Sequence, residues 1–161
     1  SVFEIQQFEY LQNHLRILSA FYGVLKPMDG VTPYRLEMQA KAEIEETTNL
    51  YDYWGDRLYH SVIDDSRTII NLASKEYSKC IERYLSDKDN YITITFCELS
   101  GDKLVIKGTY AKMARGEMVR FMAENNIENP VDIQKFDRLG YTFRGNLSSE
   151  TEYVFERKVE K

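Results

Sequence analysis

Apolar residues near the start of the chain recur at helical spacing. The positions that form this stripe are Ile5, Phe8, Leu11, Leu15, Leu18 and Tyr22. Steps of three and four residues are typical of an amphipathic helix whose apolar side faces a core. Gly23 and Pro27 predict its end. The prolines up to Pro33 predict an ordered, turn-rich loop, because proline fixes its own φ and favours extended geometry in the residue before it.

The same kind of pattern predicts helices and strands along the rest of the chain. Helices are expected at residues 50–62, 75–84 and 109–125, with a short one from 130. Strands are expected at residues 68–73, 91–99, 104–107, 140–143 and 153–157, with a further extended segment at 34–38. In the longest strand Ile92, Ile94 and Phe96 alternate with threonine, the period of a half-buried strand. The predicted fold class is α+β, a mixed sheet flanked by helices in a single domain over 1–161.

Composition narrows the class of protein. A chain of 161 residues, 43% of them hydrophobic, is long enough for one core. No apolar run approaches the ~20 residues that span a bilayer, and the first residues do not resemble a secretory signal. The two cysteines, Cys80 and Cys97, have no metal-ligand spacing and are too few for a disulfide framework. Reduced, buried thiols and a cytoplasmic location are expected.

Charge is distributed unevenly. The whole chain carries a net charge of -5, but residues 101–120 hold five cations and two acids, a local excess of +3 that leaves -8 on the rest. The overall balance argues against a protein covered in positive charge. A local basic face on an acidic body is expected instead.

Two predicted strand-to-helix junctions carry cations in the first turns of the helix. Ser74 and Thr109 are residue types that cap helices; Lys75 follows the first cap and Lys112 the second. A helix amino terminus has partial positive charge and free N–H groups, so a cation there is unfavourable by ~0.3–1 kcal/mol unless an anion joins it. Both junctions are therefore candidate phosphate sites. The alternative is that the lysines point to solvent, offset by nearby glutamates.

The second junction could begin a row of cations. Lys107, Lys112 and Arg115 would follow the start of one helix, with Lys112 and Arg115 on one flank and Arg120 further round. A phosphate backbone requires several cations spaced along a surface, which this row could supply. An ordinary solvated helix face is the competing interpretation.

Four blocks of sequence together resemble the YaaA family of bacterial peroxide-stress proteins. The blocks are Leu18–Asp29 followed by Pro33–Met38, Leu50–Asp56, Ile70–Lys79 and Tyr110–Phe121. The resemblance extends from about Phe8 to Arg157. Members of the family carry a further amino-terminal segment, so the chain is expected to be a carboxy-terminal fragment.

The resemblance implies a function in the response to hydrogen peroxide. It implies lower free intracellular iron and binding of duplex and junction DNA through a positively charged cleft, hence non-specific DNA protection or repair. The DNA- or anion-binding residues would be Arg35, Lys75, Lys79, Lys107, Lys112, Arg115 and Arg120. A helix-hairpin-helix is also ascribed to the family. Residues 111–125 and 130–136 suit its outline, although the turn between them lacks glycine and contains Glu128.

Polar residues within the matching blocks offer a different kind of site. They are Arg35, Glu37, Asp56, Asn71, Ser74 and Tyr77. Four of them, Arg35, Glu37, Asp56 and Tyr77, could form an internal polar network, because such side chains fill a core only when they pair. They could instead line a cleft in which an enzyme acts on a small anionic substrate, although no catalytic triad spacing is present and no catalytic residue is assigned. A plain interaction module would need no site.

A metal site is a further candidate because peroxide damage involves ferrous iron. Asp56, His60 and Asp64 are four residues apart, so they could share one face of a helix. Solvated side chains are the favoured interpretation. No metal, other cofactor or membrane partner is expected, and the sequence leaves the oligomeric state open.

Overall fold

The computed structural model describes residues 4–159 and has an α+β fold with a mixed sheet and flanking helices, as predicted. The chain divides into two compact units. Of the described residues, 4–10, 70–72 and 91–159 form unit 1, and 11–69 with 73–90 form unit 2. That the whole chain forms a single domain stays a prediction.

The sheet of unit 1 is built around its longest strand. Its strands are β5 (Thr68–Asn71), β6 (Asn90–Ser100), β7 (Lys103–Val105), β8 (Tyr141–Phe143) and β9 (Glu152–Arg157). The order is β5-β6-β9-β8, and β7 pairs with β6. β9 runs parallel to β6, with Phe96 opposite Phe155, whereas β7 pairs with β6 and β8 with β9 in antiparallel fashion. The sheet is therefore mixed.

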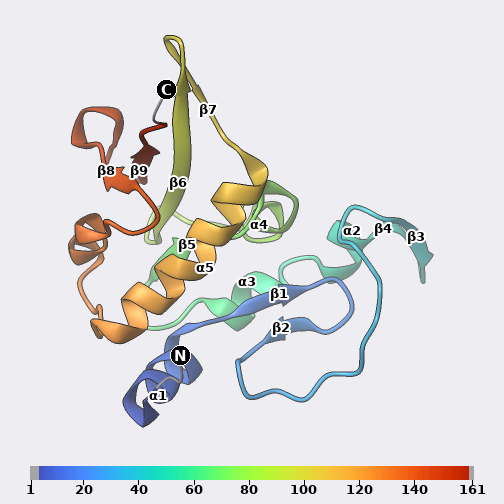
Figure 1. Ribbon diagram of the computed structural model, residues 1–161. Helices are drawn as coiled ribbons and strands as arrows, with labels where there is room; N and C mark the ends of the chain where they lie inside the picture. The colour runs from blue at the N-terminus through green and yellow to red at the C-terminus, as the bar shows by residue number, and fades with distance from the viewer. Residues whose placement is uncertain (1–3, 160–161) are drawn as a thin grey trace. The chain divides into compact units, whose positions relative to one another are not determined.

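Helix α5 (Gly108–Glu124) crosses this sheet obliquely, as the yellow-to-orange ribbon in Figure 1 shows. Alternate residues of a strand share one face, so Ile92, Ile94 and Phe96 of β6 point the same way. They join Tyr153 and Phe155 of β9 in one buried cluster. The helix contributes its small and apolar residues, Ala111, Ala114, Met118 and Phe121. This packing fixes α5 against the sheet.

The remaining elements of unit 1 are short. They are the first part of α1 (Ile5–His14) and the 3-10 helices η1 (Pro130–Lys135) and η2 (Gly145–Leu147). The Tyr10 hydroxyl of α1 donates a hydrogen bond to the Ile127 carbonyl at 2.7 Å. Because η1 is a 3-10 helix of six residues, the outline of a helix-hairpin-helix at 111–136 is not realised.

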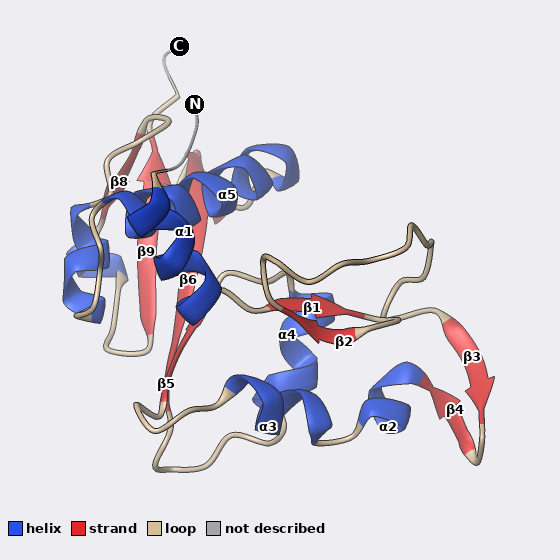
Figure 2. Cartoon of the chain, turned by 90° about the horizontal axis from the view of Figure 1, so that it is seen from below, coloured by secondary structure: helices blue, strands red, loops and turns tan. Residues whose placement is uncertain are grey.

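Unit 2 contains the end of α1, the start of β5, two short hairpins and the helices α2, α3 and α4, all labelled in Figure 2. The hairpins are β1 (Ile17–Ser19) with β2 (Gly23–Leu25), and β3 (Lys41–Ile44) with β4 (Thr47–Asn49). The helices are α2 (Leu50–Trp54), α3 (Arg57–Val62) and α4 (Lys75–Glu82). Figure 2 shows the β3–β4 hairpin leading directly into α2, where the Asn49 side chain accepts a hydrogen bond from the Asp52 N–H at 2.8 Å.

The first predicted helix is correct only as far as His14. Beyond it the chain turns back as the β1–β2 hairpin, in which Ser19 pairs with Gly23 and its hydroxyl accepts from the Tyr22 N–H at 3.0 Å. Gly23 has φ +85°, and a Cβ there would meet the Trp54 ring at 3.0 Å. The contact between Gly23 and Trp54 joins residues far apart in the sequence. The spacing of the apolar residues between 15 and 22 therefore did not predict the hairpin.

Other differences also have local causes. The helix predicted over 50–62 divides into α2 and α3, because Gly55 takes φ +54° at the end of α2. Residues 34–38 form no strand, although Met38 is fully buried. The β3–β4 hairpin was not predicted. Thr109 is not the cap of α5, since the helix begins at Gly108 with Lys107 at the N-cap.

Most downstream elements are confirmed. The predicted strands at 68–73, 91–99, 104–107, 140–143 and 153–157 correspond to β5, β6, β7, β8 and β9, and the helices at 75–84 and 109–125 correspond to α4 and α5. Ser74 is the N-cap of α4. What the strand patterns did not reveal is the order, in which β9 lies between β6 and β8.

Candidate functional site

The start of α5 is the most exposed cationic helix end predicted from the sequence. Lys107 occupies the N-cap and its side chain makes no capping hydrogen bond, and no acidic residue lies in the first turn. Residues 106–110 and Lys112 are all exposed. Because the first amide groups of a helix have no partner within the helix, this end can accept an anion from solvent.

Arg115 lies one turn further along α5 and is partly buried. Within residues 4–159 its guanidinium has no hydrogen bond or ion pair. Burial lowers the pKa of Arg115, which means that the charged form has lost solvation without gaining a counter-ion. A bound anion would restore that lost stabilisation.

The carboxylates of α5 are engaged elsewhere. Glu117 accepts from Arg138 at 3.1 Å, and Glu124 contacts Arg138 at 2.7 Å and Arg120 at 3.3 Å. These hydrogen bonds raise the pKa of Arg138, with Glu124 as the larger cause. Glu117 therefore does not offset Lys112, and Arg120 belongs to the ion-paired second half of the helix. Of the cations of α5, the two without an acidic partner in the described structure, Lys112 and Arg115, lie in the first half of the helix.

A stacked arginine holds the first turn of α5 against the sheet. The Arg157 guanidinium lies over the Tyr110 ring, 3.8 Å from its centre. Arg157 also contacts the buried carboxylate of Glu98, with its Nη2 and Oε1 2.7 Å apart. The hydrogen bond to Glu98 is the main cause of the raised pKa of Arg157. The first turn is thus positioned by contacts that leave Lys107 and Lys112 at the surface.

The start of α4, in unit 2, differs from that of α5. Lys75 forms an ion pair with Glu82 at 2.6 Å, and Glu76 lies in the first turn. The Glu76 carboxylate accepts from the Gln39 N–H at 3.2 Å. Lys79 is exposed. Lys75 and Lys79 are brought together on one helix, but with two acids beside them. Their assignment to an anion site stays a prediction.

The proposed polar network does not form. Arg35, Glu37 and Asp56 are all exposed, so the interpretation as an internal network is wrong for these three residues. Asn71 is buried in unit 1 and its amide donates to the Thr93 hydroxyl at 3.3 Å. Tyr77, on α4, has a pKa raised first by burial and then by Glu76. That Glu37, Asp56, Asn71, Ser74 and Tyr77 line a polar cleft stays a prediction.

The three candidate metal ligands, Asp56, His60 and Asp64, do not converge on one point, because Asp64 has other hydrogen-bond partners than the other two. His60 and Asp56 pair at 3.1 Å on the surface of α3. Asp64 instead accepts from the Ser66 N–H at 2.9 Å in the turn that follows. Within residues 4–159, no group of three or more His, Cys, Asp or Glu side chains is placed to hold a metal ion.

Both cysteines are free and buried, as predicted. Burial raises the pKa of Cys80 to about 11 and also raises that of Cys97. Because the thiolate is the form that reacts with peroxide, thiols held protonated in this way are poor peroxide sensors.

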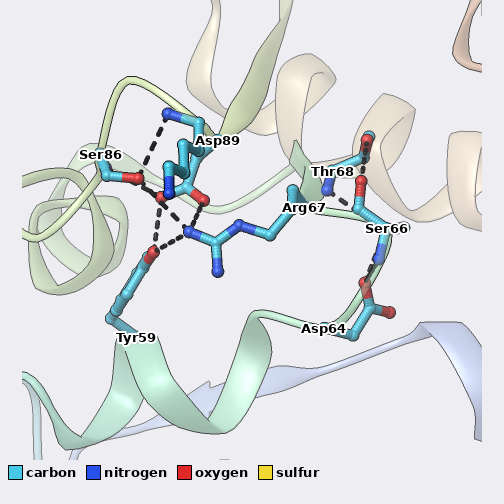
Figure 3. A network of polar contacts seen from close by, with 8 residues as sticks. Tyr59, Asp64, Ser66, Arg67, Thr68, Ser86 and Asp89 are labelled. Carbon is cyan, nitrogen blue, oxygen red and sulfur yellow. Dashed lines mark hydrogen bonds and ion pairs between the residues drawn. The ribbon is translucent and has the colours of Figure 1, made fainter.

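A buried polar network was missed by the sequence analysis (Figure 3). The Asp89 carboxylate, almost fully buried, contacts the Arg67 guanidinium at 2.5 Å and accepts from the Tyr59 hydroxyl at 2.5 Å and the Ser86 N–H at 2.9 Å. The Ser86 N–H, followed by Tyr59, lowers the pKa of Asp89. The network ties α3 to two loops of unit 2. In the described structure the Arg67 Nε is buried without a hydrogen-bond partner, whereas the Tyr59 hydroxyl and the Ser86 N–H both donate to Asp89, which indicates a structural function.

Among the described helices, none combines the length and the apolar character needed to cross a bilayer.

Comparison with known proteins identifies the relatives of the chain. A family model described as peroxide stress protein YaaA matches residues 1–147. A UPF0246 protein of Agathobacter rectalis is 79% identical over 99% of this chain and 64% of its own length. UPF0246 proteins of Lachnoclostridium phytofermentans and Desulfitobacterium hafniense are 55% and 54% identical, over 96% and 98% of this chain. The chain thus spans 60–64% of the length of these relatives.

Proposed function

Since the chain belongs to the YaaA family of peroxide stress proteins, we propose that it acts during hydrogen peroxide stress by binding the phosphate backbone of DNA. The binding surface is the first half of α5, with Lys107, Lys112 and Arg115 as its cations. Binding to phosphates alone carries no sequence information, so the proposed activity is non-specific.

One observation supports this proposal above the others. Among residues 4–159, Lys107, Lys112 and Arg115 follow one helix without a carboxylate partner, while the acids of the same helix are paired with Arg120 and Arg138. Positive charge is therefore concentrated at one end of α5 although the chain is acidic as a whole. Such local concentration is what attracts a polyanion to an acidic protein.

The shape of the surface favours a polymer over a small molecule. Lys107 and Lys112 are exposed rather than enclosed, and Thr109 and Tyr110 between them are exposed as well. Cations spaced along a helix can contact successive phosphates of one strand. Each contact releases a condensed counter-ion, so the affinity would fall steeply as salt is added.

The direct test is fluorescence anisotropy with labelled duplexes. Two duplexes of equal length and unrelated sequence are titrated with the chain and with its Lys107→Glu, Lys112→Glu double variant. We expect equal affinities for the two sequences and much weaker binding by the variant. Thermal unfolding of the variant, monitored by circular dichroism, serves as the control for folding. Absence of binding at low salt, or a strong preference for one sequence, would overturn the proposal.

Limitation of free iron is proposed as an associated effect of the family rather than of residues in this chain. It can be measured as free iron in peroxide-treated cells by electron paramagnetic resonance, with the protein present or absent. If cells with the protein carry as much free iron as cells without it, this part of the proposal fails while the DNA-binding part is untouched.

A further inference from the structure

Unit 2 contains an open pocket that the proposed DNA-binding surface does not use. Its volume is about 370 Å³, within the range of roughly 300–1,000 Å³ that is common for small-molecule sites. Three cations line it, Arg16, Lys26 and Arg57, with Asp29 as the acidic residue of the lining. The pocket is therefore positively charged within an acidic chain.

The two arginines are held in place by backbone carbonyls. Arg16 donates through Nη1 to the Gln12 and Leu15 carbonyls at 3.0 and 2.8 Å, and through Nη2 to Asn13 at 3.3 Å. Arg57 donates through Nε to the Trp54 carbonyl at 3.1 Å and through Nη2 to the Tyr53 carbonyl. Both guanidiniums are thus oriented before any ligand arrives.

These hydrogen bonds leave some N–H donors of both arginines free for a ligand. A guanidinium has five N–H donors, of which Arg16 uses three and Arg57 two for the carbonyls. Neither forms an ion pair with a carboxylate in the described structure. Capping of α1 and α2 would explain why each arginine bonds carbonyls. It does not explain why Arg16, which follows α1, and Arg57, the first residue of α3, line one pocket together with a lysine.

Lys26 and Asp29 are the two ends of a tight turn at the pocket. The Lys26 N–H donates to the Asp29 Oδ2 at 2.8 Å, and the Asp29 N–H donates to the Lys26 carbonyl at 3.0 Å. The Lys26 side chain itself is exposed and has no described polar partner. Asp29 is thus a turn-forming residue, and the ammonium of Lys26 is available to a ligand.

An apolar floor completes the pocket. The Trp54 indole N–H donates to the Ala20 carbonyl at 2.9 Å, which fixes the ring beside Val24 and Leu58. Gly23 permits this arrangement, because any Cβ at that position would strike the ring. A ligand for such a site combines an anionic group with a less polar body.

From this geometry we infer that the pocket binds a small phosphate monoester, with its phosphate between Arg16, Lys26 and Arg57 and its body over Trp54 and Leu58. Planar guanidiniums match the oxygen geometry of a phosphate, and three cations suit its double negative charge better than that of a carboxylate. The same phosphate chemistry could come from a DNA strand, so the test separates the two sources.

The test uses Trp54 as its reporter, because it is the only tryptophan of the chain. Its fluorescence is followed while ribose 5-phosphate, inorganic phosphate, acetate or a short duplex is added at constant ionic strength. We expect a saturable change with ribose 5-phosphate, a weaker one with inorganic phosphate and none with acetate. In Arg57→Gln the affinity for ribose 5-phosphate should fall about tenfold, the loss expected for one charge-assisted bond.

Two variants keep the test independent of folding. Lys26→Gln removes a side chain without a described polar contact and should weaken binding without altering thermal unfolding. Asp29→Asn retains an oxygen for the turn and removes a negative charge, so it should strengthen binding. Lys79→Gln, a cation of the same unit outside the pocket, is the matched control and should change nothing.

The outcomes that overturn the inference are distinct. If no phosphate compound gives a saturable change, or if Lys79→Gln has the same effect as Lys26→Gln, the pocket is not a phosphate site. If the duplex alone changes the signal, the ligand is not a small monoester. A loss of thermal stability in Arg57→Gln without any change in binding would leave the arginine only as a helix cap.

Discussion

The starts of α4 and α5 share the features from which the sequence predicted two anion sites, yet they differ in charge balance. Both follow a strand, both have an N-cap whose side chain makes no capping bond, and both carry lysine close by. At α4, Lys75 is paired with Glu82, and Glu76 lies in the first turn. At α5 the first turn has no acid, and Glu117 is paired with Arg138 instead.

The difference shows that a cation near a helix start is informative only when its acidic neighbours are known. The partner of Lys75 lies two turns along its own helix, whereas the partner of Glu117 lies 21 residues away in sequence. The first pairing keeps positive charge from accumulating at α4. The second withdraws the acid that could have neutralised Lys112.

The largest effect is expected from reversing the exposed charges at each start. The Lys107→Glu, Lys112→Glu variant should weaken binding to any duplex by roughly 10- to 100-fold, because it removes two phosphate contacts and adds repulsion. The matched Lys75→Glu, Lys79→Glu variant should change the affinity by no more than about threefold. Anisotropy titrations at one salt concentration compare them. Equal losses in the two variants would remove the distinction between the helices.

A smaller effect should follow when the negative charges beside Lys75 and Lys79 of α4 are removed. Glu76→Gln with Glu82→Gln preserves oxygen acceptors and deletes two negative charges, so Lys75 and Lys79 become available. We expect duplex binding to tighten by roughly two- to fivefold, as added electrostatic attraction of this size implies. The same titration measures it, and unchanged affinity would mean that α4 takes no part even when its acids are gone.

Arg115 should reveal a conflict between stability and binding. Replacing this partly buried, unpaired cation with methionine should leave the free energy of unfolding unchanged or raise it by up to about 1 kcal/mol, because a desolvated charge is lost. Duplex binding should weaken at the same time. Urea unfolding and anisotropy give the two values. Arg120→Met, which breaks the pair with Glu124, is the control and should destabilise the protein.

The smallest effect concerns the caps themselves. Ser74→Ala should cost less than about 0.5 kcal/mol of unfolding free energy, since the Ser74 side chain makes no capping bond. Asn49→Ala is the matched control, because Asn49 does cap α2 and its loss should cost about 1 kcal/mol. Urea denaturation resolves the two. A larger cost for Ser74 would show that the start of α4 depends on its cap after all.

Local patterns predicted those elements whose packing agrees with their own periodicity. β6 is an example, since its alternation of Ile92 and Ile94 with threonine corresponds to its buried and less buried faces. The β1–β2 hairpin could not be predicted in this way, because Gly23 at the start of β2 lies against the Trp54 ring, a contact that local periodicity does not contain. The position of β9 between β6 and β8 likewise depends on pairing between residues about sixty apart.

For the candidate site, too, the sequence predicted part of the picture: which residues form it, but not how their charges are balanced. The residues of the α5 surface were identifiable because their cations lie three to five apart on one predicted helix. Their electrostatic state was not, since it depends on Arg138, which draws Glu117 and Glu124 away. The pocket of Arg16, Lys26 and Arg57 was missed entirely, because the sequence interpretation placed Arg16 inside a helix that in fact ends at His14.

The central claim, that DNA binding depends on the unpaired cations of α5, is tested most directly by the salt dependence of duplex affinity. The slope of log affinity against log salt concentration is measured for the chain, for Lys107→Gln with Lys112→Gln, and for Lys75→Gln with Lys79→Gln. Each phosphate contact contributes about -0.9 to that slope, so the α5 variant should have a slope shallower by about 2 and the α4 variant the original slope. Identical slopes for all three proteins would contradict the account.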